Sequence, residues 1–103
     1  MNDQERGLLF VEREKLEKQV EQMNKELVQH GILLNQFGQK LQERPESMTF
    51  SNAPQGLGSY PLEYMREESF NWDDFPSIDS IAQKIQNYRT IIGQLSDVKR
   101  RLK

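Results

Sequence analysis

Apolar side chains recur over residues 9–41 with alternating gaps of three and four residues. A seam of this kind, sustained over about five heptads, is typical of a helix that packs along its length against another helix. The pattern predicts a helix over about residues 3–43, roughly 60 Å long at 1.5 Å per residue. The heptad a positions are Arg13, Val20, Leu27, Leu34 and Leu41, and the d positions are Leu9, Leu16, Met23, His30 and Phe37.

A second heptad pattern lies at the C-terminal end of the chain and predicts a helix over about residues 78–102. Ser77 can cap its start, and basic residues in the last turn suit the negative end of the helix dipole. Its a positions are Ile78, Ile85, Ile92 and Lys99, its d positions are Ile81, Tyr88, Leu95 and Leu102, and Ile91 and Val98 widen the stripe at g.

Residues 44–76 form a connector that holds all four prolines of the chain. Pro61 at a first helical position favours a short helix over 61–68. Disordered segments are normally poor in aromatic residues, so the aromatic side chains here either cover a helix seam or bind a partner. They are Phe50, Tyr60, Tyr64, Phe70, Trp72 and Phe75.

The fold class that these patterns predict is all-α, with two heptad-patterned helices joined by a long aromatic-rich connector. We expect a long helical hairpin or coiled coil that forms a single elongated domain over residues 1–103. With 35% apolar and 29% charged residues, the chain has little material for a deep globular core, so we expect it to dimerise into a helical bundle.

The second helix could return in either direction along the first, and we expect it to run antiparallel. An antiparallel return needs the least ordering of the connector and would leave the apolar stretch 8–11 uncovered. Fully extended, however, the 33 connector residues could reach on the order of 110 Å, which also permits a parallel return.

Several classes of protein are disfavoured. The chain has no cysteine and one histidine, His30, so we expect no metal site and no cofactor. Phosphate-binding loops and hydrolase motifs are not found in the sequence, and we expect no enzymatic activity. The longest apolar runs fall far short of the roughly 20 residues that span a bilayer, so a cytoplasmic location is expected.

The segment Asn71–Phe75 places two carboxylates between aromatic residues. In one interpretation, Asp73 and Asp74 simply precede a helix start while Phe70, Trp72 and Phe75 anchor the connector on the hairpin. Alternatively, the segment is an acidic, aromatic docking motif for another protein. Acid/base catalysis is the least favoured interpretation, because the sequence supplies no opposing group.

Candidate partner-binding residues share apolar or aromatic character: Leu8, Leu9, Phe10, Val11, Phe70, Trp72 and Phe75. The predicted self-association seam consists of Leu16, Val20, Met23, Leu27, Leu34, Phe37 and Leu41. Gly31 and Gly38 both fall at e beside this seam, and their cost in a helix predicts close packing there.

The net charge is −2, but residues 77–103 hold six bases and two acids. Their terminal bases could contact an anion, and these are Lys99, Arg100, Arg101 and Lys103. The leading expectation is a non-enzymatic protein-protein interaction module (an adaptor, assembly factor or regulatory subunit) with itself and another protein as partners. The alternatives are a nucleic-acid-associated protein that uses the basic tail, and a chaperone-like helical hairpin.

Overall fold

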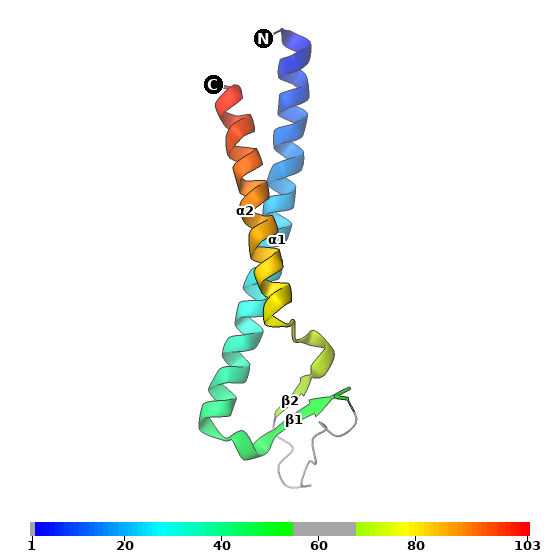
Figure 1. Cartoon of the computed structure of the whole chain (residues 1–103), viewed down its shortest axis with the longest axis vertical. Helices are drawn as coiled ribbons and strands as arrows, with labels where there is room; N and C mark the ends of the chain where they lie inside the picture. Colours follow the sequence, from blue (N-terminus) through cyan, green and yellow to red (C-terminus); the bar gives the residue numbers. More distant parts are fainter. Residues whose placement is uncertain (1, 55–67) are drawn as a thin grey trace. The chain divides into compact units, whose positions relative to one another are not determined.

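The computed structural model describes residues 2–54 and 68–103. Helix α1 spans Asp3–Glu43 and helix α2 spans Ile78–Arg101, where the heptad patterns predict helices (Figure 1). The chain divides into two compact units. Met1–Val28 with Ile78–Lys103 is called the hairpin unit here, and Gln29–Ser77 is called the aromatic unit.

Local sequence explains both ends of α1. The side-chain oxygen of Asn2 accepts a 2.7 Å hydrogen bond from the backbone N–H of Glu5, which satisfies a donor that the first turn leaves free. At the other end Arg44, just before Pro45, leaves the helical region with φ of −147° and ψ of 69°. The residue before a proline disfavours helical geometry, so α1 stops there.

In the hairpin unit the two helices run antiparallel (Figure 1). Tyr88 on α2 lies beside Asn24, whereas Lys99, further along α2, lies 3.9 Å from the earlier Glu17. Antiparallel was therefore the right choice between the two directions. The expectation that residues 8–11 would be left uncovered is wrong for Leu9, which packs against the hairpin core.

The core of the hairpin unit is small. Leu16 on α1 is 3% exposed and meets Leu95 and Val98 on α2. Full burial of such a side chain stabilises the fold by about 1.5–3 kcal/mol. Partly buried residues extend this core along both helices: Leu9, Val20, Ile91 and Leu102.

The row that α2 turns toward α1 differs from the predicted one. The buried and half-buried positions that follow α2 with gaps of three and four are the d and g positions: Ile81, Lys84, Tyr88, Ile91, Leu95, Val98 and Leu102. The isoleucines at a lie outside this contact: Ile78 is 75% exposed, Ile85 38% and Ile92 41%. The stripe on α2 is three rows wide, and one neighbouring helix covers only two of them.

The aromatic unit contains a two-stranded sheet that the sequence analysis did not predict. Strand β1 (Met48–Ser51) pairs in parallel with β2 (Glu68–Asn71), with Phe50 opposite Phe70. Short 3-10 helices, Pro45–Ser47 and Trp72–Asp74, precede β1 and follow β2. The predicted short helix over 61–68 lies outside the described residues except for residue 68, which begins β2.

Phe37 of α1 stands at the centre of an aromatic cluster in this unit. Its ring centroid lies 5.8 Å from that of Phe50, 5.5 Å from Phe70 and 5.1 Å from Phe75. Edge-to-face pairs at these distances contribute about 0.5–1.5 kcal/mol each beyond the area that they bury. The connector is therefore anchored on α1 through its aromatic residues.

The seam of α1 changes phase within the aromatic unit. His30, Leu33 and Phe37 are half-buried, whereas the predicted seam residues Leu34 and Leu41 are exposed. An α-helix has 3.6 residues per turn rather than 3.5, so a straight helix drifts away from a strict heptad. Here the helix packs against strands and aromatic rings instead of a second helix, so the a row stays exposed.

Close packing at Gly31 and Gly38 is not seen among the described residues. A Cβ atom added at either position would meet no heavy atom within 4 Å. Both glycines lie inside α1, so neither is its C-terminal cap. Within the described chain the e row at these positions faces no neighbouring element, and close packing there against a second subunit stays a prediction.

Candidate interaction surfaces

An apolar surface lies near the start of α1. Leu8 is 67% exposed and Val11 is 64% exposed, whereas Leu9 between them turns into the core. A shallow hollow of about 550 Å³ adjoins this surface, and it is lined by Glu5, Leu8, Leu9, Glu12 and Arg101. Of the four apolar residues predicted here as a partner site, Leu9 is partly buried against the hairpin core and offers little free surface.

Phe10 belongs to a different environment from its neighbours. The guanidinium of Arg13 lies 4.9 Å from the centre of its ring, and that of Arg6 lies 5.8 Å away. Arginine over an aromatic face is favourable by roughly 0.5–1 kcal/mol at an exposed site. Arg13 Nε also lies 3.8 Å from Glu17 Oε1. The ring of Phe10 is therefore flanked by cations, and Leu8 and Val11 form the freer apolar surface.

The second apolar surface is the a row of α2. We call Ile78, Ile85 and Ile92 the outer isoleucine row. Near its C-terminal end a hollow of about 500 Å³ is lined by Ile92, Leu95, Ser96, Lys99, Arg100 and Lys103. Sequence reasoning missed this surface, although the widening of the stripe by Ile91 and Val98 was a sign that one row would be left over.

The third surface lies in the aromatic unit. Trp72 is 37% exposed and its ring lies 5.5 Å from that of Phe50. An open hollow of about 410 Å³ is lined by Phe37, Phe50, Trp72, Phe75, Pro76 and Ser77. Phe70 is buried and Phe75 half-buried, so of the three predicted partner residues here only Trp72 offers much surface.

In this segment the side chain of Asn71, rather than the two carboxylates, supports local structure. Asn71 caps the 3-10 helix Trp72–Asp74 by accepting a 3.0 Å hydrogen bond from the backbone N–H of Asp73. Asp73 and Asp74 are both exposed. Within residues 2–54 and 68–103, no group of three or more histidine or acidic residues could hold a metal ion. The Asn71 side chain thus stabilises the turn of chain between β2 and Phe75.

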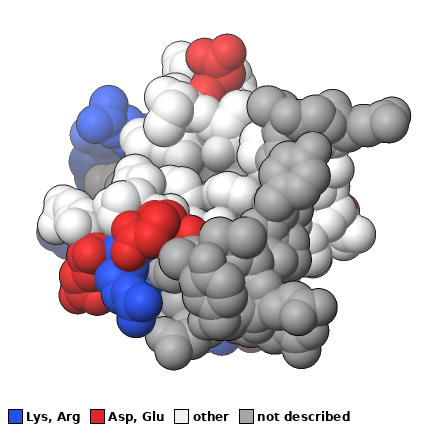
Figure 2. Space-filling view, turned by 90° about the horizontal axis from the view of Figure 1, so that it is seen from below, with Lys and Arg blue, Asp and Glu red and all other residues white. Residues whose placement is uncertain are grey.

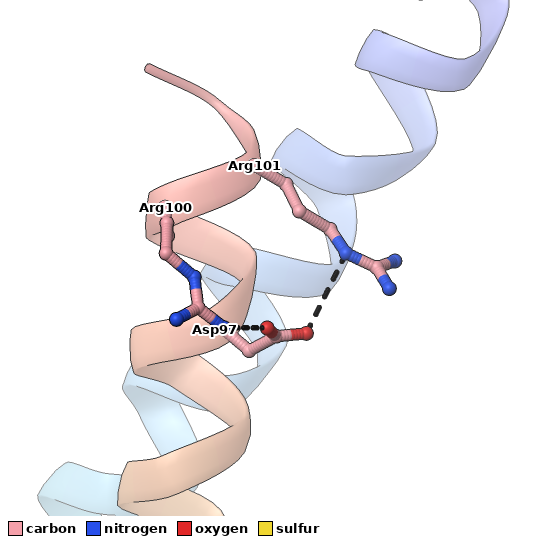
Figure 3. A network of polar contacts seen from close by, with 3 residues as sticks. All are labelled: Asp97, Arg100 and Arg101. Carbon is pink, nitrogen blue, oxygen red and sulfur yellow. Dashed lines mark hydrogen bonds and ion pairs between the residues drawn. The ribbon is translucent and has the colours of Figure 1, made fainter.

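Most of the bases at the end of α2 have carboxylate neighbours. Figure 3 shows Arg100 and Arg101 both reaching the carboxylate of Asp97. The ion pair of Arg100 with Asp97 measures 2.5 Å, and that of Arg101 measures 3.5 Å. The hydrogen bond from Arg100 and then the charge of Arg101 lower the pKa of Asp97 below its ordinary value. Lys99 lies near Glu17. These contacts partly neutralise the predicted anion-binding tail.

Charge is interspersed elsewhere as well. In the view of Figure 2, acidic and basic side chains of the described part of the chain lie beside one another, amid uncharged surface. Also among the described residues, neither helix has a stretch long and apolar enough to cross a membrane.

Comparison with protein-family models, with curated protein sequences and with solved structures finds no match to this chain. Function is therefore inferred from the chain's own surfaces.

Proposed function

We propose that this protein is a non-enzymatic interaction module, a helical hairpin that self-associates as a coiled-coil dimer and presents apolar surface to another protein. Adaptors, assembly factors and regulatory subunits act in this way. Of the predicted seam, Leu16 and Val20 pack in the core that α1 shares with α2 of the same chain, so we assign self-association to rows outside that contact.

The observation that carries the proposal is the imbalance between core and surface in the hairpin unit. Three apolar residues are buried there, Leu16, Leu95 and Val98. Exposed large apolar residues in the same unit outnumber them, and they are Leu8, Phe10, Val11, Val28, Ile78, Ile85 and Ile92. Rows of this kind along a helix are typical of surfaces that associate with another chain.

A chaperone-like hairpin is the second candidate. The hollow beside Leu8 is lined by two leucines and by two acids, Glu5 and Glu12, against one base, Arg101. An amphipathic helix with basic residues along the edge of its apolar face would complement that surface. Nucleic-acid binding has less support, because Asp97 and Glu17 already lie beside three of the four terminal bases.

Light scattering at several protein concentrations tests the proposal. We expect the measured mass to rise with concentration from the monomer value of 12.2 kDa toward twice that value. A monomer mass throughout the range would contradict self-association. The double variant Leu8→Asp, Val11→Asp then separates the two surfaces, since it should weaken binding of a partner helix and leave the dimer intact.

A further inference from the structure

We propose that the occupant of the outer isoleucine row is a second copy of this chain, with two α2 helices packed antiparallel about a two-fold axis at Ile85. This inference rests on the proposed self-association and names the surface that performs it. Ile78, Ile85 and Ile92 lie on α2, clear of the rows that face α1.

The row is continuous along one side of the helix. Its members are seven residues apart, which places successive isoleucines roughly 10.5 Å apart at 1.5 Å per residue. Ile85 is 38% exposed and Ile92 is 41% exposed, so each presents a large part of its side chain to solvent. A row at heptad spacing supplies one of the two apolar rows by which one helix packs along another.

The row is also self-complementary under reversal. Turning α2 end over end about Ile85 brings Ile78 of one copy opposite Ile92 of the other, and Ile85 opposite Ile85 of the second copy. A two-fold interface requires this property, because the same patch must serve both subunits. All three isoleucines then find an apolar partner.

Charge favours the antiparallel arrangement over the parallel one. The bases Lys99, Arg100, Arg101 and Lys103 lie at one end of α2, and Asp79 lies at the other. A parallel pair would bring the two basic ends together and align the two helix dipoles, and both effects are repulsive. The antiparallel pair separates the basic ends and brings the exposed Arg89 near Asp79 of the second copy.

The interface is small. Three partly exposed isoleucines per copy place it at the low end of protein-protein interfaces, where association is weak and transient. We therefore expect a dimer that dissociates on dilution, and a covalent trap is the appropriate way to define its geometry.

Thiol cross-linking supplies that trap, because the natural chain contains no cysteine. Ile85→Cys is expected to form a disulfide-linked dimer by itself on mild oxidation. Ile78→Cys and Ile92→Cys should each cross-link poorly alone and efficiently when mixed with one another. Thr90→Cys is the matched control: Thr90 is exposed on the same helix, on the side away from the row. Circular dichroism confirms that each variant keeps its helices.

The outcomes distinguish a wrong helix arrangement from a lack of self-association. Cross-linking of Ile85→Cys alone, together with the mixed pair, supports the antiparallel row. Self-linking of Ile78→Cys and of Ile92→Cys would establish a parallel pair and overturn the inference. A dimer by light scattering that gives no link at the row would overturn the inference while self-association stands. A monomer at all concentrations would contradict both the antiparallel interface and the proposed self-association.

Discussion

The side-chain amide of Asn24 donates a 3.0 Å hydrogen bond to the hydroxyl of Tyr88, joining two helices across 64 residues of sequence. Close by, Lys84 Nζ lies 2.7 Å from Glu26 Oε1. The apolar contacts further along the hairpin would tolerate sliding better than these directional ones. The polar pairs therefore fix the register of α2 on α1.

Tyr88→Phe removes the hydroxyl from this pair and keeps the ring. We expect the free energy of unfolding to fall by about 0.5–1 kcal/mol, at the low end for a hydrogen bond because Asn24 is exposed. Urea denaturation of Tyr88→Phe, Asn24→Ala and the double variant gives the coupling energy directly. Additive effects of the two substitutions would show that the hydrogen bond does not contribute.

Leu16→Ala should destabilise the hairpin more than any other single truncation on α1. Leu16 is the most buried residue of the core, and losing such a side chain costs about 2–5 kcal/mol. Leu41→Ala is the control on the same helix, where the side chain is 49% exposed and the loss should be well under half as large. Urea denaturation followed by circular dichroism measures both. Equal losses would mean that the two residues are equally buried in solution.

Gly31→Ala should stabilise the protein. The new methyl group would meet no heavy atom of the described chain within 4 Å, and alanine is favoured over glycine inside a helix by about 1 kcal/mol. A rise in the melting temperature checks this expectation, with Gly7→Ala as a second site of the same kind. A loss of stability at Gly31 would instead reveal a close neighbour there.

The carboxyl of Asp97 should titrate below the usual range for aspartate. Its pKa is lower in the folded chain than in the unfolded one, so the ionised form adds stability above the unfolded pKa. That contribution is lost as the pH falls through the folded pKa. Carbon-13 NMR of the Asp97 carboxyl measures the midpoint directly.

Arg100→Gln should raise the midpoint of Asp97, because it removes the hydrogen bond that is the largest cause of the shift. Arg89→Gln removes the same charge about two turns away and is expected to change the midpoint much less. Equal effects of the two substitutions would mean that overall charge, rather than the contact in Figure 3, sets the pKa.

Phe37→Ala should loosen the aromatic unit. The chain has one tryptophan, Trp72, which contacts Phe50, and Phe50 in turn contacts Phe37. We expect a red shift of tryptophan emission as water reaches the indole. Phe10→Ala, which removes a ring of the hairpin unit, is the matched control and should leave the emission unchanged. An unchanged spectrum in Phe37→Ala would show that Trp72 does not depend on this cluster.

Both helices could be predicted from sequence because their apolar periodicity is long and regular. Leu16 and Leu95 were placed in seams and are indeed core residues. The choice between rows on α2 could not be predicted, since periodicity defines a stripe and leaves open which of its edges a neighbour takes. The strands were missed because Met48–Ser51 and Glu68–Asn71 are four residues each, too short to show alternation.

The candidate surfaces were only partly predictable for the same reason. Exposure of Leu8 and burial of Leu9 depend on one helical step, which is set by the register with α2. Phe70 and Trp72 likewise share one short segment, and the strand β2 turns Phe70 toward Phe37. Composition identifies these residues as apolar, but it does not decide which of them are buried within the chain and which stay exposed for a partner.

Placement of the outer isoleucine row outside the contact between α1 and α2 has an evolutionary consequence. Under the proposed self-association, selection could act on Ile78, Ile85 and Ile92 for association while the contact between α1 and α2 is kept. Exchanging one of these isoleucines for a charged residue would weaken the proposed contact between copies while the hairpin keeps its fold.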